Sequence, residues 1–90
     1  MTESEFKRSI QACATMRHTT NKPLAFDFLL GYQRGLRRAY HGESFGTAEE
    51  HALWLSLGDE QLDRGRQARG RGYRAGLAGT PIEETEIWGK

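Results

Sequence analysis

Residues 24–40 read LAFDFLLGYQRGLRRAY, and they are the longest segment of the chain that keeps an uninterrupted apolar stripe at helical spacing. Asp27, Arg34 and Arg38 fall together on another side of the same helix. The pattern predicts a core helix that ends at Gly42, because glycine adopts the left-handed cap conformation at little cost. The predicted core side of this helix carries Ala25, Phe28, Leu29, Tyr32, Leu36, Ala39 and Tyr40.

The centre of this segment, GYQRGL at residues 31–36, returns near the end of the chain as GYRAGL at residues 72–77. Glycine has no side chain, so a strip of glycines lets the backbone of another helix approach closely. We therefore expect the last helix to pack closely on the core helix, with a tyrosine from each beside the contact. The predicted packing residues are Gly31, Tyr32, Gly35, Gly72, Tyr73 and Gly76.

Two capping boxes predict where two further helices begin. Residues 2–5, TESE, can satisfy the first free N–H groups of a helix that carries Phe6, Ile10 and Cys13 and runs to about Arg17. Pro23 is tolerated in the first turn of the core helix that follows. A second box at residues 47–50, TAEE, opens a third helix with Leu53, Trp54 and Leu57 on one face.

A fourth helix is predicted from a cap at Asp59 to an end marked by Gly79 and Pro81, and it includes Leu62, Ala68, Tyr73 and Leu77. Each interior glycine costs a helix about 1 kcal/mol relative to alanine, so this segment needs a compensating contact. In one continuous helix, Gly58, Gly65, Gly72 and Gly76 would line one side. The alternative is that Gly70-Arg71-Gly72 breaks the helix into two pieces.

The fold class that follows is all-α, a compact bundle of three to four helices over residues 1–79 with a short C-terminal tail at 80–90. Ninety residues with 37% hydrophobic content are enough for one modest core. The tail carries Ile82, Ile87 and Trp88, and it either folds back over the bundle or serves as an arm for a partner.

One cysteine, Cys13, cannot form an internal disulfide, and this favours a reducing, intracellular setting. The chain shows neither a run long enough to span a membrane nor the apolar stretch of a signal peptide, so we expect a cytoplasmic protein without a membrane partner.

No set of residues predicts catalysis, and we expect neither an enzyme nor a cofactor. Residues 42–46, GESFG, match the G-x-S-x-G pattern of serine hydrolases, but that pattern needs a preceding strand, and here a helix precedes it. His18, His41, His51 and Cys13 show no recognised metal-ligand spacing. His41 instead suits a helix C-terminus, where the dipole favours a cation, and His51 is expected at the surface or rim.

Arginines are concentrated in two segments. The larger group falls within eleven residues and comprises Arg64, Arg66, Arg69, Arg71 and Arg74, and the smaller group comprises Arg34, Arg37 and Arg38. On a continuous helix, Arg64, Arg71 and Arg74 share the face opposite the glycines. If the two helices pack together, the groups form one positive surface, with Asp27 elsewhere. The net charge is only +1, and charge divided in this way suits docking to one oriented partner.

The sequence therefore predicts a non-catalytic module that binds an acidic protein surface through these arginines, with Trp54 or Trp88 as an aromatic anchor. Small single-domain chains of this kind are typical of inhibitor and accessory proteins of phages and other mobile elements. Three alternatives stay open: the arginines bind nucleic-acid phosphates, they form a solvated face, or the glycine strips pair two copies in a homodimer.

Overall fold

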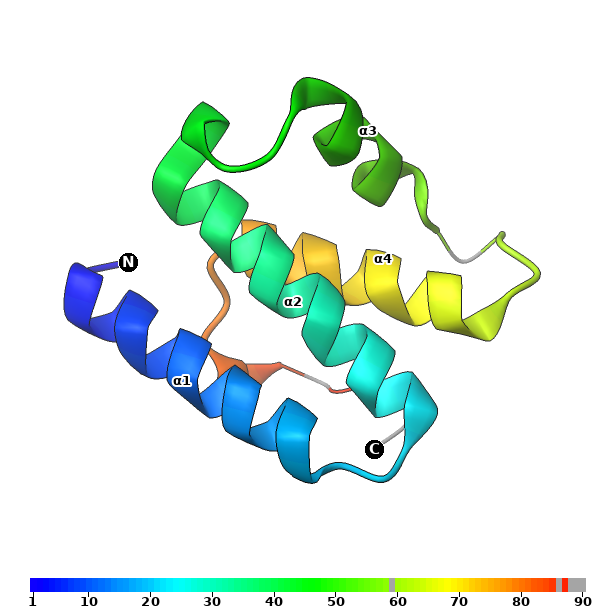
Figure 1. Cartoon of the computed structure of the whole chain (residues 1–90), viewed down its shortest axis with the longest axis horizontal. Helices are drawn as coiled ribbons and strands as arrows, with labels where there is room; N and C mark the ends of the chain where they lie inside the picture. The colour runs from blue at the N-terminus through cyan, green and yellow to red at the C-terminus, as the bar shows by residue number, and fades with distance from the viewer. Residues whose placement is uncertain (59, 86, 88–90) are drawn as a thin grey trace.

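The computed structural model describes residues 1–58, 60–85 and 87, and these form a purely helical bundle without strands (Figure 1). The elements in chain order are α1 (Glu3–Thr19), α2 (Pro23–His41), η1 (Gly42–Ser44), α3 (Ala48–Ser56), α4 (Arg64–Leu77) and η2 (Ile82–Glu84), where η marks a 3-10 helix. The predicted all-α class with three to four helices is confirmed.

Local signals set the first two helices as expected. The Thr2 hydroxyl accepts from the Glu5 backbone N–H at 3.1 Å and caps α1, which runs to Thr19, two residues beyond the predicted end at Arg17. Pro23 opens α2, and Gly42 follows it with a φ of 65°, the left-handed region that favours glycine.

The α2–α4 crossing is the centre of the fold, and glycines make it possible (Figure 1). A side chain at any of four positions would overlap backbone of the facing helix: Gly31 and Gly35 face the carbonyls of Arg69 and Tyr73, while Gly72 and Gly76 face those of Phe28 and Tyr32. The predicted contact between the two GYxxGL segments is therefore present within one chain.

α4 is a single helix, but it begins later than predicted. Asp63 caps it by accepting from the Gly65 backbone N–H at 2.7 Å, while the predicted cap, Asp59, lies outside the described residues. The prediction that Leu62 belongs to this helix is wrong, since Leu62 is 99% exposed in the connection before it. Gly70 and Gly72 do not break the helix because both lie against neighbouring backbone, and this packing offsets their low helix propensity.

The core lies between α1, α2, α4 and η2, and it is built from Phe6, Cys13, Phe28, Leu29, Tyr32, Leu36, Ala68 and Ile82. The prediction that Ala39 and Tyr40 face the core is wrong, because both residues are exposed and line an open surface pocket between the start of the chain and the end of α4. Tyr40 instead stacks on Phe6 with ring centroids 4.1 Å apart.

The first part of the tail folds back on the bundle. Ile82 is buried in η2, which contacts α1, and the Tyr32 hydroxyl donates to the Thr80 carbonyl at 2.6 Å. Ile87 packs against the same core. Trp88, which was predicted as an aromatic anchor together with Trp54, lies outside the described residues.

Candidate functional site

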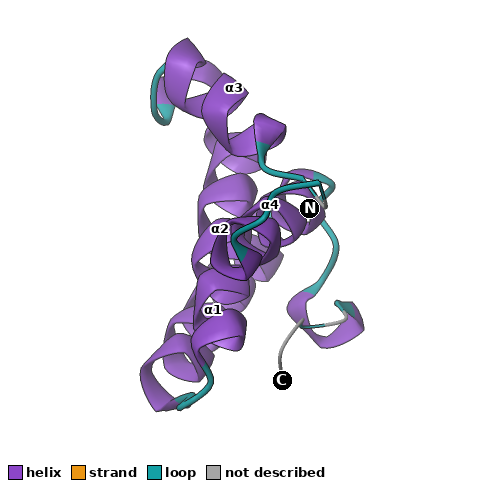
Figure 2. Ribbon diagram, turned by 90° about the vertical axis from the view of Figure 1, so that its right-hand side faces the viewer, coloured by secondary structure: helices purple, strands orange, loops and turns teal. Residues whose placement is uncertain are grey.

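α3 lies at the edge of the molecule, on the far side of α2 and α4 from α1 (Figure 2). Thr47 caps it as predicted, accepting from the Glu50 backbone N–H at 3.1 Å. Although Leu53, Trp54 and Leu55 follow one another in α3, none of its nine residues is fully buried. Leu53 is 60% exposed and Leu55 40% exposed. Exposed apolar side chains that gather on one element are typical of an interaction surface.

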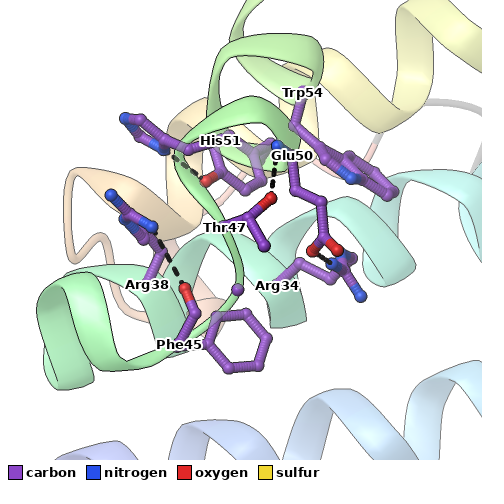
Figure 3. Close-up of a pocket in the computed structure, with 9 residues that line it drawn as sticks. Arg34, Arg38, Phe45, Thr47, Glu50, His51 and Trp54 are labelled. Atoms are coloured by element: carbon purple, nitrogen blue, oxygen red, sulfur yellow. Dashed lines mark hydrogen bonds and ion pairs between the residues drawn. The ribbon is translucent and has the colours of Figure 1, made fainter.

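A small cluster, here called the α3 anchor, holds this helix on α2 and α4 (Figure 3); its members are Arg34, Glu50, His51, Trp54 and Tyr73. The His51 Nδ1 atom lies 2.6 Å from the Tyr73 hydroxyl. Trp54 stacks on Tyr73 with ring centroids 5.8 Å apart. Arg34 Nη2 donates to Glu50 at 3.0 Å, and the Arg34 guanidinium lies 5.1 Å from the centroid of the Trp54 ring.

The α3 anchor is closed rather than hollow. The space that it shares with Arg38, Phe45 and residues 46–47 is about 10 Å³, which is roughly the room of one water molecule. Burial raises the pKa of the Tyr73 hydroxyl, and the positive charges of Arg38 and Arg34 partly offset this effect. The cluster therefore fixes α3 in place and leaves its leucines facing outward.

The polar side of α2 predicted from sequence is the side that holds the next two helices. Asp27 accepts from Arg69 of α4 at 3.0 Å, Arg34 binds Glu50 of α3, and Arg38 donates to the Phe45 carbonyl at 3.1 Å. The expectation that Asp27 lies away from the arginines of α4 is wrong, since the close packing of α4 on α2 brings Arg69 beside it.

A groove runs between α3 and α4. Its lining residues, Leu53, Trp54, Leu57, Arg66 and Arg69, enclose about 280 Å³. Leu53, Trp54 and Leu57 were predicted to share one face, and they share this lining. Arg69 is held by Asp27, whereas Arg66 is exposed at the rim. We call this the α3–α4 groove: an apolar floor with a cationic edge.

The eight predicted arginines do not form one uniform surface. Several hold other parts of the chain in place: Arg34 contacts Glu50, Arg38 contacts Phe45, Arg69 contacts Asp27, and Arg74 Nη1 donates to the Leu57 carbonyl at 2.7 Å. Arg37 lies on the α1 side of α2. Arg64, Arg66, Arg71 and Arg74 are exposed along α4.

The residues considered for chemistry have structural surroundings. The Ser44 hydroxyl donates to the His41 carbonyl at 2.7 Å in a turn that follows a helix. His41 is the last residue of α2, where it was placed from sequence. Cys13 is buried with its thiol donating to the Leu29 carbonyl at 3.2 Å. In the described part of the chain, no three His, Cys, Asp or Glu side chains group closely enough to hold a metal ion.

Sequence reasoning missed two contacts of the candidate site. His51, expected at the surface or rim, is half-buried against Tyr73, because the helices that carry them meet only in the folded chain. Gly70, considered only as a helix breaker, lies against the Leu57 backbone and lets the end of α3 approach α4. Its position two residues before the GYRAGL segment is the one signal that could have indicated a packing role.

Among the described residues, no helix combines the length and the apolar content needed to cross a membrane. Comparison of the chain with protein-family models, curated proteins and solved structures finds no match.

Proposed function

We propose that this protein is a non-catalytic protein-binding module whose α3–α4 groove takes up an acidic, leucine-bearing helix of a different protein. The observation that carries the proposal is the exposure of Leu53 beside the exposed cation of Arg66. Inhibitor and accessory proteins act by such docking, without chemistry of their own.

The groove offers both parts of a specific contact. Fully burying a leucine side chain stabilises a complex by about 1.5–3 kcal/mol, and the exposed Leu53 of the groove lining is available for this. An amphipathic helix presents its apolar residues at the spacing that a groove between two helices accepts. Arg66 at the rim selects against cationic partners and orients acidic ones.

The structure offers less support for pairing of two copies through glycine. The backbones of α2 and α4 already cover Gly31, Gly35, Gly72 and Gly76 within one chain, so these glycines have no surface left for a second copy. A homodimer would therefore have to use another surface of the chain.

The test begins with capture of partners from nuclease-treated extracts of the source cell by the wild-type protein, Leu53→Asp, Arg66→Glu and a control, Arg8→Glu. Arg8 is exposed on α1 and does not line the groove. We expect a protein that the wild type and Arg8→Glu retain and that both groove variants lose. Titration calorimetry with that purified protein should then show binding at least about tenfold weaker for Leu53→Asp.

Binding to nucleic acid remains the second candidate, because Arg64, Arg66, Arg71 and Arg74 are exposed along α4. Mixed-sequence DNA and RNA are titrated at low and moderate salt. Binding that weakens steeply with salt and that Leu53→Asp leaves unchanged would favour phosphate contacts and count against the protein partner. Light scattering adds a third outcome: a dimer that Leu53→Asp dissociates would make the partner a second copy.

A further inference from the structure

A second concave surface lies between α1 and the middle of α2, away from the α3–α4 groove. Leu30, Gln33, Arg34 and Arg37 recur along one side of α2, and Arg17 of α1 and Phe45 complete the lining of about 210 Å³. We call these six residues the Arg17–Arg37 pocket. This volume is about twenty times that of the space within the α3 anchor, so a small ion with some of its hydration fits.

Polar atoms without partners gather at this pocket. In the described part of the chain, the buried side-chain nitrogen and oxygen atoms that lack a hydrogen-bond partner are Gln33 Oε1, Arg34 Nε and Arg37 Nε. The three residues that carry these atoms line the α2 side of the Arg17–Arg37 pocket, while the atoms themselves lie buried beneath its surface. Native proteins leave few buried polar groups unpaired, so a small movement of these side chains toward a bound anion would give the three atoms partners.

The charge of the pocket has one sign. Three of its six lining residues are arginines, and none is acidic. Arg34 also binds Glu50 through Nη2 at 3.0 Å, and Glu50 does not line the pocket. Three guanidinium groups around one small hollow repel one another, and an anion placed among them would remove that repulsion.

Two of these cations are held in place by aromatic rings. The Arg34 guanidinium carbon lies 5.6 Å from the centroid of the Phe45 ring, and that of Arg17 lies 5.9 Å from the centroid of the Phe26 ring. Holding a guanidinium in position before binding reduces the ordering cost that a ligand would otherwise meet. Guanidinium groups match the oxygens of phosphate in pairs of parallel hydrogen bonds.

We infer that the Arg17–Arg37 pocket binds a phosphate group, either the free ion or a small phosphomonoester. Arg17, Arg34 and Arg37 donate to its oxygens, and the Gln33 amide, which can both donate and accept, contacts a further oxygen. This site is independent of the proposed protein-binding function, because its lining shares no residue with the α3–α4 groove.

The test is a titration of the full chain, labelled with nitrogen-15, with inorganic phosphate at constant ionic strength maintained with sodium chloride. We expect saturable shifts of amide signals around residues 17, 30–37 and 45. Arg37→Gln and Arg17→Gln should each weaken the apparent affinity by about tenfold or more, because each removes a charged donor. Arg8→Gln removes an exposed arginine of α1 outside the pocket and should leave the affinity unchanged. Arg34 is not varied because it also holds α3 through Glu50.

Melting temperature gives a second reading that does not depend on signal assignment. Phosphate at constant ionic strength should raise the melting temperature of the wild type and of Arg8→Gln, and not that of Arg17→Gln or Arg37→Gln.

Glycerol phosphate and acetate serve as parallel ligands. Binding of phosphate alone supports a free-ion site, and equal or tighter binding of glycerol phosphate supports a site for monoesters. Shifts that grow linearly without saturation, acetate binding as tight as phosphate, or an equal loss in Arg8→Gln would overturn the inference.

Discussion

At the scale of single residues, Gly72 shows how packing outweighs helix propensity. An alanine Cβ atom at this position would lie 2.8 Å from the Tyr32 backbone nitrogen and 2.9 Å from the Phe28 carbonyl carbon. These are backbone atoms in the middle of α2, so they can move away only if the two helices separate. The absence of a side chain therefore matters more here than the flexibility that glycine brings.

We expect Gly72→Ala to lower the free energy of unfolding by about 1–3 kcal/mol, although alanine in an open helix would gain about 1 kcal/mol. The comparison is Gly65→Ala, whose Cβ would have the side-chain carboxylates of Asp27 and Asp63 as its nearest contacts, and a side chain can shift at less cost than the backbone of a packed helix. It should change stability by less than about 1 kcal/mol. Urea unfolding followed by circular dichroism measures both variants. A stabilised Gly72→Ala protein would contradict the close crossing of α2 and α4.

At the scale of helices, α3 and α4 begin with similar caps but differ in what they bury. Thr47 caps α3 and Asp63 caps α4, each through its side chain. α4 buries Ala68, Tyr73 and three glycines against the rest of the fold, whereas α3 buries none of its residues. Elements with few buried contacts open locally at low free energy, so α3 should open without unfolding the bundle.

Removal of each cap separates local from global stability. Asp63→Ala should lower the free energy of unfolding of the whole protein by about 1 kcal/mol, while Thr47→Ala should mainly accelerate amide exchange within α3. Amide exchange in α2 reports the free energy of global unfolding, and amide exchange in α3 reports local opening of that helix. The urea midpoint gives an independent measure of global stability. An equal fall in the urea midpoint for the two variants would show that α3 unfolds together with the core.

At the scale of the whole molecule, three buried weak acids make the fold sensitive to high pH. Burial raises the pKa of Cys13 from 9.0 to about 11, with the charge of Arg17 opposing the shift, and it also raises the pKa values of Tyr32 and Tyr73. In the folded chain these groups hold their protons to higher pH than in the unfolded chain. Stability is therefore complete below about pH 9 and falls as the pH rises further.

For Cys13 the loss should reach roughly 2–3 kcal/mol by about pH 11, since one pKa unit corresponds to about 1.4 kcal/mol. Cys13→Ser keeps a small side chain that can donate to the Leu29 carbonyl, and it does not titrate in this range. Urea unfolding between pH 8 and pH 11 should show a shallower decline for this variant than for the wild type. Parallel declines would mean that the Cys13 thiol does not carry the effect.

The features readable in the sequence are those that neighbouring residues produce. The apolar stripe of α2, the caps at Thr2 and Thr47, the end at Gly42 and the repeated glycines depend on spacings of a few residues, and each is present in the fold. The candidate site was partly readable for the same reason, because Leu53, Trp54 and Leu57 share a helical face by spacing alone.

Other features depend on which distant segments meet, and spacing along the chain does not contain that information. The exposure of Tyr40 beside Phe6, and the contact of His51 with Tyr73, depend on how α1 packs on α2 and how α3 packs on α4. The same arrangement leaves Leu53 exposed on α3 and brings Arg37 of α2 and Arg17 of α1 to one pocket. A side chain's burial is set by whatever packs over it, so the two proposed binding surfaces could be located only after the helices were placed together.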